Sequence, residues 1–255
     1  MPLEIVTVPC LTDNYAYLAH DAATGATAVI DVPEAAPILN ALRRRSWRAS
    51  HILITHHHDD HIAGVKALAA ATGARVIGAA ADSHRLPRLD EALSEGDEVR
   101  VGMDHGQVID VSGHTMGHIA FHFPESNVVF TADSLMALGC GRLFEGTPQR
   151  MWQSLSKLAA LPGDTLVCSG HEYTESNARF ALTIEPNNAD LISRAEAITA
   201  ARRDGQATVP SLLSDELATN PFLRARLPEV KAAIGMVGAS DAETFAEIRA
   251  RKDRF

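Results

Sequence analysis

The feature that most constrains this chain is a run of histidines and aspartates directly after an apolar segment. Residues 56–61 read His-His-His-Asp-Asp-His, whereas 12 histidines in 255 residues predict about 0.3 in a window of six. The run lies between a β-type segment, His51–Ile54, and an Ala-rich segment, Ile62–Ala71, with the composition of a helix. We therefore expect a strand, a loop and a helix, with imidazole and carboxylate groups that converge on a metal ion. The alternative is a surface histidine tract of accidental metal affinity, but such tracts lie in tails.

Short β-type runs mixed with helical segments continue to about residue 173. The β-type runs are LEIVTV, YAYLAH, TAVIDV, HILI, VIDVS, IAFHF, NVVFTADS and TLVCS, and the helical segments include EAAPILNALRRR and PQRMWQSLSKLAAL. From about residue 174 the β pattern stops, and the remainder is predicted to be helices broken at Pro186, Pro210, Pro221 and Pro228. The sequence therefore predicts a layered α/β domain over 1–173 and a helical domain over 174–255.

Charge and cysteine content narrow the class of protein. The 23 basic and 32 acidic residues give a net charge of −9, which argues against nucleic-acid and anionic-membrane partners. The sequence has no apolar stretch near the roughly 20 residues of a membrane helix, and its start lacks a signal-peptide pattern. Cys10, Cys140 and Cys168 are an odd number at irregular spacing, so we expect no disulfide framework and a soluble, cytoplasmic protein.

Three further candidate ligands each follow a β-type run. His114 comes after VIDVSG, Asp133 ends VVFTAD, and His171 comes after LVCSG. Sites form outside strand ends in open α/β sheets, so these loops can converge on the 56–61 loop. With His57 and Asp59 left out, five histidines and two aspartates remain, enough for two metal ions that share one carboxylate. The candidate metal ligands are His56, His58, Asp60, His61, His114, Asp133 and His171.

Other catalytic motifs fail on inspection. The sequence His171-Glu-Tyr-Thr-Glu175 begins like the H-E-x-x-H zinc helix but has a glutamate in place of the second histidine. A dinucleotide fingerprint begins at Gly139 but ends at Phe144, where a glycine is required. The sequence contains neither a Gly-x-Ser-x-Gly elbow nor a Walker A motif, and the cysteines are interpreted as small buried residues rather than nucleophiles.

The motifs resemble a known family. The segment Thr55–His61 fits the Thr-His-x-His-x-Asp-His signature of the metallo-β-lactamase superfamily. Segments that resemble glyoxalase II, the hydroxyacylglutathione hydrolases, cover 113–119, 139–147, 170–177, 220–222 and 249–255. The resemblance extends over essentially the whole chain, and it implies a four-layer αββα metallo-β-lactamase sandwich with a helical C-terminal domain whose last helix reaches over the active site.

The resemblance also implies how the ligands are divided. His56, His58 and His114 would hold one metal ion, and Asp60, His61 and His171 the other, with Asp133 as the bridge. Asp31 resembles the aspartate that orients the metal loop in the superfamily, whereas His118 and His122 are left out of the metal set. Five imidazoles and two carboxylates suit Zn, Fe or Mn; zinc is our first expectation and iron the second.

Substrate contacts follow from the same resemblance. The residues at the matching positions are Arg142, Tyr173, Asn177, Arg249 and Lys252. Independently of the family, the segment RARKDR at 249–254 gathers four basic residues in an acidic protein, which suits the carboxylates of a glutathione thioester. Phe144 stands where some members have a tyrosine, so one hydroxyl contact is missing, and Ser134 replaces the commoner threonine after the bridging aspartate.

The implied activity is hydrolysis of S-(2-hydroxyacyl)glutathione, such as S-D-lactoylglutathione, to D-lactate and glutathione in methylglyoxal detoxification. The nucleophile is a hydroxide that bridges the two metal ions, so a side-chain nucleophile is not needed. A persulfide dioxygenase, a β-lactamase or lactonase, and a metal-binding module without catalysis are the alternatives. We expect a monomer.

Overall fold

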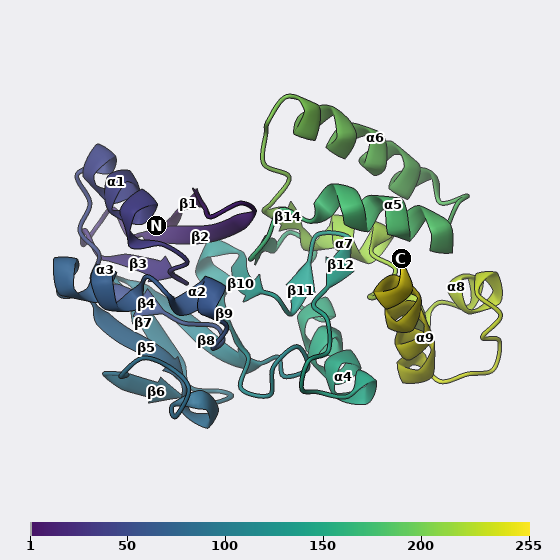
Figure 1. The fold of residues 1–255 in the computed structure, drawn as a ribbon, viewed down its shortest axis with the longest axis horizontal. Helices are drawn as coiled ribbons and strands as arrows, with labels where there is room; N and C mark the ends of the chain where they lie inside the picture. The colour runs from purple at the N-terminus through teal and green to yellow at the C-terminus, as the bar shows by residue number, and fades with distance from the viewer. Residues whose placement is uncertain (1) are drawn as a thin grey trace.

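The computed structural model describes residues 2–255, in which two six-stranded sheets form the centre of the molecule (Figure 1). The first sheet has the order β1-β2-β3-β4-β5-β6. Its strands are β1 (Glu4–Cys10), β2 (Asn14–His20), β3 (Thr27–Ile30), β4 (His51–Leu53), β5 (Arg75–Ala79) and β6 (Glu91–Leu93). The pairs β1–β2 and β2–β3 are antiparallel, whereas β3, β4, β5 and β6 are parallel, so the chain needs crossovers after β3, β4 and β5. Helices α1 (Ala35–Arg45), α2 (Asp59–Ile62) and α3 (Val65–Thr72) lie in these crossovers.

The second sheet has the order β14-β13-β10-β9-β8-β7. Its strands are β7 (Glu98–Val101), β8 (Asp104–Asp110), β9 (Ile119–Phe123), β10 (Val128–Ala132), β13 (Leu166–Ser169) and β14 (Ser211–Leu212). A separate small hairpin pairs β11 (Leu135–Met136) with β12 (Gly139–Cys140). The strands predicted as IAFHF, VVFTA and LVCS are therefore confirmed.

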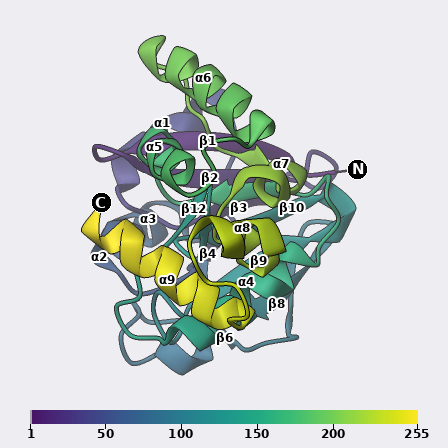
Figure 2. The same ribbon diagram turned by 90° about the vertical axis from the view of Figure 1, so that its right-hand side faces the viewer.

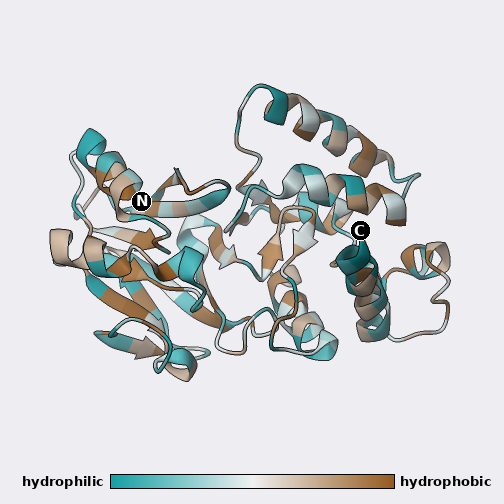
Figure 3. Ribbon diagram, in the orientation of Figure 1, coloured by the Kyte–Doolittle hydropathy of each residue, from teal (hydrophilic) through white to brown (hydrophobic). Residues whose placement is uncertain are grey.

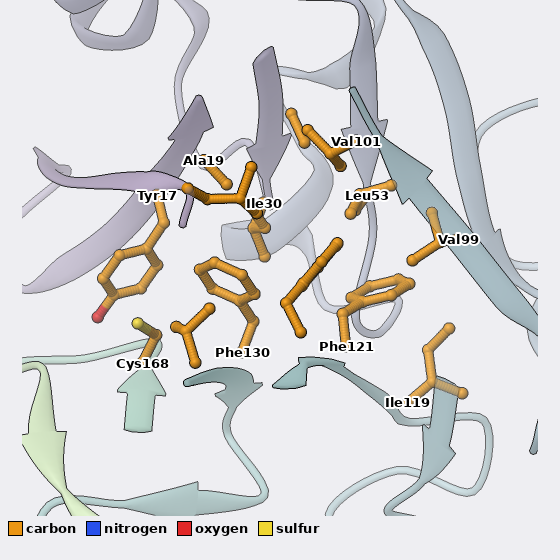
Figure 4. Packing of buried hydrophobic residues seen from close by; sticks show 14 of the residues in the cluster. Tyr17, Ala19, Ile30, Leu53, Val99, Val101, Ile119, Phe121, Phe130 and Cys168 are labelled. Atoms are coloured by element: carbon orange, nitrogen blue, oxygen red, sulfur yellow. The ribbon is translucent and has the colours of Figure 1, made fainter. Parts of the chain in front are cut away.

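The hydrophobic cores show why the sheets stack. Every residue of strand β2 is buried. Because side chains alternate along a strand, both faces of β2 are therefore covered. Tyr17 and Ala19 point between the sheets toward Phe121 and Phe130 of the second sheet (Figure 4). Leu18, next along β2, packs on the other face in the cluster that includes residues of α1 and α3.

The outer face of the second sheet is covered by helix α4 (Pro148–Ala159) and parts of the C-terminal segment. Thr147 caps α4 and Pro148 begins it, as the sequence predicts for that helix. The layers are therefore helix, sheet, sheet and helix, and the predicted αββα architecture is confirmed.

The C-terminal segment contains α5 (Thr174–Ile184), α6 (Ala189–Arg203), α7 (Leu213–Thr219), α8 (Pro228–Ala233) and α9 (Asp241–Arg254). Figure 2 shows these helices on the side that faces the viewer. The apolar side of α9 packs on α4 through Phe245 and Trp152, whereas its C-terminal end is hydrophilic (Figure 3). Within residues 2–255, the longest apolar helical stretches fall short of what a membrane crossing needs.

Two predictions at the level of elements need correction. The helix expected over 62–71 is present as α3 but begins later, at Val65, because a separate short helix, α2, begins inside the histidine run at Asp59 and the chain breaks at Gly64. A Cβ atom on Gly64 would lie 2.7 Å from the Ala35 nitrogen, so the break is packed tightly on α1. The segment after 174 is not purely helical, because β14 pairs with β13 at the edge of the second sheet.

Candidate metal centre and substrate pocket

All seven candidate metal ligands meet at one end of the two sheets. His56, His58, Asp60 and His61 lie after β4, in the loop and first turn of α2. The other three come from the second sheet, just beyond β8, β10 and β13: His114, Asp133 and His171. Loops at strand ends therefore bring together residues from 56 to 171, the arrangement expected from the sequence.

The ligand atoms form two groups. In the first, nitrogen atoms of His56, His58 and His114 lie within 4.8 Å of one another. In the second, atoms of Asp60, His61 and His171 lie within the same distance. His58 Nδ1 is 3.0 Å from His114 Nε2, and His61 Nε2 is 3.3 Å from His171 Nε2. Nitrogen lone pairs this close face a common centre in each group.

The carboxylate of Asp133 reaches both groups. Its Oδ2 lies 3.5 Å from His114 Nε2 and 3.3 Å from His171 Nε2, and its Oδ1 lies 3.5 Å from His61 Nε2. Asp133 is the residue that contacts imidazoles of the first and the second group together.

Partners behind the imidazoles fix which nitrogen faces the centre. Asp31 accepts from the Thr55 backbone N–H and hydroxyl at 2.9 and 2.8 Å, and its Oδ2 is 2.8 Å from His61 Nδ1. His114 Nδ1 lies 2.7 Å from the carbonyl oxygen of Arg142, to which it can only donate. Since Nδ1 carries a proton in the rings of His61 and His114, Nε2 of each ring is the atom that can bind a metal ion. A grouping of Asp31 with His56 and His61 is also close enough for a metal, but these hydrogen bonds occupy both oxygens of Asp31.

Two orienting residues, one in the β1–β2 turn and one at the start of β2, were not predicted from the sequence. Asp13 Oδ1 lies 3.1 Å from His171 Nδ1, and Asn14 donates from Nδ2 to the backbone oxygen and to Oδ2 of Asp60, both at 3.0 Å. The segment TDN was interpreted only as a turn. Its partners lie 46 and 158 residues away, so no local pattern could have revealed them.

The residues present fit a metal. His56 Nε2 and Asp133 Oδ1 are buried, and among the residues that the structure describes neither has a hydrogen-bond partner. A buried polar atom without a partner is costly unless a ligand satisfies it. Imidazole nitrogens and carboxylate oxygens are donors that divalent metal ions prefer. This end of the sheets is therefore a divalent metal site.

The two groups differ in electrostatics. Burial, together with the neighbouring imidazoles, lowers the pKa of His56 well below its usual value, so this ring is neutral. Burial by itself would lower the pKa of His61, but the carboxylates of Asp133, Asp31 and Asp60 outweigh it and raise the pKa to about 9. The electrostatic potential at the second group, Asp60, His61 and His171, is therefore the more negative of the two, and it favours a bound positive charge.

Two glycines allow the backbone to approach the ligands. A Cβ atom on Gly141 would lie 2.0 Å from the Asp133 backbone oxygen and 2.8 Å from His114 Nδ1. A Cβ atom on Gly170 would lie 2.6 Å from Asp133 Oδ1. Side chains at these positions would displace the ligands, because backbone and ring atoms cannot move aside cheaply.

A pocket of about 610 Å³ opens over the metal groups. Five of the candidate metal ligands line it: His58, Asp60, His114, Asp133 and His171. Every residue that the resemblance implied for substrate binding lines it as well: Arg142, Tyr173, Asn177, Arg249 and Lys252. Residues of the C-terminal helices α5 and α9 thus lie beside ligands from the sheets.

The basic side chains of the pocket differ in exposure and in how many contacts hold them. Arg142 is well exposed, and the Lys252 ammonium lies 3.3 Å from the Ser176 carbonyl oxygen. Arg249 is 7% exposed and is held by the Cys140 carbonyl at 2.9 Å, by Asp253 at 3.0 Å and by the ring of Phe222. Arg249 therefore also joins α9 to β12, a role that the sequence did not predict.

The other predicted pocket residues have neighbours of their own. The Tyr173 ring stacks on His171 with centroids 4.6 Å apart, and Asn177 donates to the Ala137 carbonyl at 3.0 Å. Phe144 is 61% exposed, and its ring meets His58 and His114 edge-on at 5.5 and 5.3 Å between centroids. An apolar ring therefore covers the side of the first metal group.

The remaining histidines and cysteines lie outside the two groups. The His118 ring stacks on His56 at 4.5 Å, and His122 lies in β9. All three cysteines are buried and unpaired. Burial raises the pKa of Cys10 and of Cys140 to about 11 and holds that of Cys168 well above its usual value, so the interpretation of the cysteines as buried residues is confirmed and their thiols are poor nucleophiles.

Comparison with known proteins gives two family matches that together span most of the chain. Residues 16–171 match the metallo-beta-lactamase superfamily, and residues 172–255 match the hydroxyacylglutathione hydrolase C-terminus. A protein named hydroxyacylglutathione hydrolase from Cereibacter sphaeroides is 68% identical over 255 residues, which cover 100% of both chains.

Solved structures agree with the fold. ETHE1 from Myxococcus xanthus has a TM-score of 0.68 and 25% identity, over 98% of this chain and 90% of its own. The protein TTHA1623 in a di-iron-bound form has a TM-score of 0.56 and 29% identity, over 66% of this chain and 91% of its own.

Proposed function

The chain belongs to the hydroxyacylglutathione hydrolase family of the metallo-beta-lactamase superfamily, and from this premise we propose which residues carry its reaction. The enzyme is a thioester hydrolase that cleaves S-(2-hydroxyacyl)glutathione to a 2-hydroxy acid and glutathione, and its role is methylglyoxal detoxification. The observation that carries the assignment of residues is one pocket that is lined both by the imidazoles and carboxylates of the metal groups and by basic side chains.

Two metal positions are proposed. His56, His58 and His114 would hold one ion, Asp60, His61 and His171 the other, and Asp133 would contact both. The support is the separation of the ligand atoms into two groups that the Asp133 carboxylate joins. When bound, two divalent ions would supply a water-derived nucleophile at neutral pH and polarise the thioester carbonyl.

The protein's own side chains and backbone would orient the metal-ligand rings and bind the substrate. Asp31, Asp13 and the Arg142 carbonyl hold three ligand rings, so that their lone pairs already point inward before the substrate arrives. The chain does not need a side-chain nucleophile, and the buried thiol of Cys140 in the pocket wall, with its raised pKa, is unsuited to be one.

Basic residues on the pocket wall would bind the glutathione part. Arg142 and Lys252 have donors that carboxylates can reach, and charge-assisted hydrogen bonds to carboxylates are the strong ones. Arg249, Tyr173 and Asn177 complete the proposed contacts. Arg249 would contribute mainly through its charge, because Cys140 and Asp253 already occupy most of its donors.

Metal identity follows only partly from the donors. Imidazole and carboxylate without thiolate suit Zn, Fe and Mn, and we propose zinc first. Iron is the second candidate, a choice supported by the di-iron form of the structural relative TTHA1623.

Three further expectations stand as proposals. The division into 1–173 and 174–255 is supported by the family matches, which change at 171. A cytoplasmic location is supported by three cysteines without disulfides in residues 2–255. The monomer is a prediction that sedimentation velocity would test.

One experiment tests the proposed function. Protein purified without chelator is analysed for metals and assayed with S-D-lactoylglutathione, a β-lactam and glutathione persulfide. We expect close to two metals per chain and turnover of the thioester alone. A fully active enzyme with one metal per chain would overturn the two-position assignment.

A further inference from the structure

Beside the pocket, four polar side chains from three separate segments form one hydrogen-bonded cluster. These are His57 in the metal loop, Asp82 and Arg85 after β5, and Glu145 in the loop before α4. We refer to His57, Asp82, Arg85 and Glu145 as the Arg85 network. None of them has a part in the reaction as described above.

Arg85 is the centre of this network. Its Nε and Nη2 lie 3.1 and 2.5 Å from Asp82 Oδ1, and its Nη1 and Nη2 donate to the two oxygens of Glu145. Nη1 also lies 3.2 Å from His57 Nε2. One guanidinium therefore contacts two carboxylates and an imidazole, each from a different turn of the chain.

The hydrogen bonds fix the state of His57. A guanidinium only donates, so His57 Nε2 must accept and the proton must lie on Nδ1. Nδ1 is 3.0 Å from Asp82 Oδ2, to which it donates. A lysine cannot replace this arrangement, because its single ammonium lacks the planar set of donors.

Asp82 holds the network against a third loop. It is 2% exposed, and a Cβ atom on Gly117 would lie 2.1 Å from its carboxyl carbon. A carboxylate this deeply buried needs a charged partner, which Arg85 supplies. The position of Arg85 is therefore determined by a buried anion and is not that of a freely moving surface side chain.

Glu145 belongs to the loop that forms part of the pocket wall. Its Oε2 accepts from the Met116 backbone N–H at 2.7 Å. In the same loop, Arg142 and Phe144 line the pocket, and the Phe144 backbone N–H donates to the His114 carbonyl at 3.2 Å. Movement of Glu145 would thus move the side chains that face the substrate.

We propose that Arg85 is a positioning residue for the glutathione thioester. By joining Glu145 to Asp82 and His57, it holds the loop 141–146 against the metal loop and keeps Arg142 and Phe144 in place over the pocket. Arg85 does not line the pocket in the part of the chain that the structure describes, so it acts through the loop. The inference rests on the proposed function, in which Arg142 binds the glutathione part.

The test uses full-length, metal-loaded enzyme and steady-state kinetics with S-D-lactoylglutathione. Arg85→Met keeps an apolar stem and removes the guanidinium. Residues that couple to a site through a network change affinity by about two- to thirty-fold, so we expect KM to rise by that factor. We expect kcat to change by less than about twofold and the metal content to stay at the wild-type level, because every proposed ligand is retained.

A double-variant cycle isolates the contact. Glu145→Gln should also raise KM, and Arg85→Met combined with Glu145→Gln should raise it no further than Arg85→Met alone. Arg85→Lys, which keeps the charge but reaches one carboxylate, should give an intermediate KM. Additive effects of the two substitutions on log KM would show that Arg85 and Glu145 act separately, and would overturn the proposal.

Arg224→Ala is the matched control. Arg224 also forms two hydrogen bonds to one glutamate, Glu185, both at 2.8 Å, but it lies outside the pocket lining. We expect its loss to lower Tm and leave KM unchanged. If Arg85→Met shows the same result, the network is only structural; if its metal content falls, the network supports the metal loop. Either result refutes the positioning role.

Two features keep the test decisive. If Arg85→Met does not fold, Arg85→Lys and Glu145→Gln still report KM, and an unchanged KM in both overturns the inference. Failure of the wild-type enzyme to hydrolyse the thioester would instead refute the proposed function, and it would be seen before any variant is compared.

Discussion

Asp133 is the residue on which both candidate metal groups depend. Burial alone would raise its pKa, but the facing imidazoles of His61, His171 and His114 together lower the pKa well below the usual range. The carboxylate is therefore charged at any physiological pH, and it supplies negative charge to both positions.

Replacing Asp133 with Ala should lower metal occupancy at both positions. The substitution removes the shared anion, so the two cations would repel each other without compensation. Elemental analysis of the purified variant, beside wild type treated identically, measures the effect. Full metal content with near-normal turnover would show that Asp133 is not the shared ligand.

The proposed role of Lys252 predicts that substrate binding depends on pH. Burial, with the nearby charges of Arg249 and Arg179, lowers the pKa of Lys252 to about 8. Below that pH the ammonium is charged and would attract a glutathione carboxylate, and this attraction would be lost as pH rises through about 8. We expect kcat/KM for S-D-lactoylglutathione to fall over this range, since kcat/KM reports groups of the free enzyme.

Two comparisons check this assignment. Lys252→Arg keeps its charge at all these pH values, so its profile should lose the fall near pH 8. A small thioester without carboxylates should show no such fall in the wild type. A fall that persists in Lys252→Arg would assign it to another group.

At the scale of elements, helix α9 has two separable roles. Arg249 is buried and ties α9 to the Cys140 carbonyl, whereas Lys252 is only half-buried. Arg249→Ala should therefore lower Tm by about 3 to 10 °C as well as raise KM. Lys252→Ala should raise KM by about ten- to a hundred-fold with Tm nearly unchanged. Thermal unfolding and steady-state kinetics on the two variants distinguish these outcomes; equal Tm decreases would contradict them.

The elements that could be predicted from the sequence are those with a local pattern. The strands IAFHF and VVFTA carry apolar runs of strand length, and the proline at 148 marks the start of α4. Strand β14 has two residues, Ser211 and Leu212, too few for any periodicity, and it exists because β13 offers a free edge. Tertiary pairing therefore decided this strand, and the equally short β11 and β12 were likewise not predicted from the sequence.

The candidate site shows the same difference between residues with a local sequence pattern and residues without one. The seven candidate ligands could be found because histidines and aspartates gather at strand ends and match a family signature. Asp13, Asn14 and Arg85 have ordinary sequence surroundings, and their partners are distant in the chain. Groups that orient ligands are defined by the packing of separate loops, which no window of sequence contains.

At the scale of the whole molecule, the metal site connects the two sheets. Its ligands come from the loop after β4 of the first sheet and from three loops of the second. An ion that binds the folded state alone stabilises the fold, by about 2.7 kcal/mol at a hundred times its dissociation constant. Chelation should therefore lower Tm by about 5 to 10 °C, and added metal should restore it.

Differential scanning calorimetry with and without chelator measures this effect. Arg75→Ala, which removes an ion pair between β5 and β6, is a suitable control variant because Arg75 pairs with His51 at the start of β4, whereas the candidate ligands follow the end of β4. It should show the same decrease on chelation as the wild type. An identical Tm for metal-free and metal-loaded wild type would contradict the connection between the metals and the fold.

Helix α9 follows every candidate metal ligand in the chain, which sets an order of assembly during synthesis. The last proposed metal ligand is His171, whereas Arg249 and Lys252 lie within the final seven residues. Chains emerge from the ribosome N-terminal end first, so both sheets and every metal ligand leave it before α9 does. We therefore expect a nascent chain to capture its ions before α9 completes the proposed glutathione-binding wall, and to hydrolyse glutathione thioesters efficiently only after α9 has joined the fold.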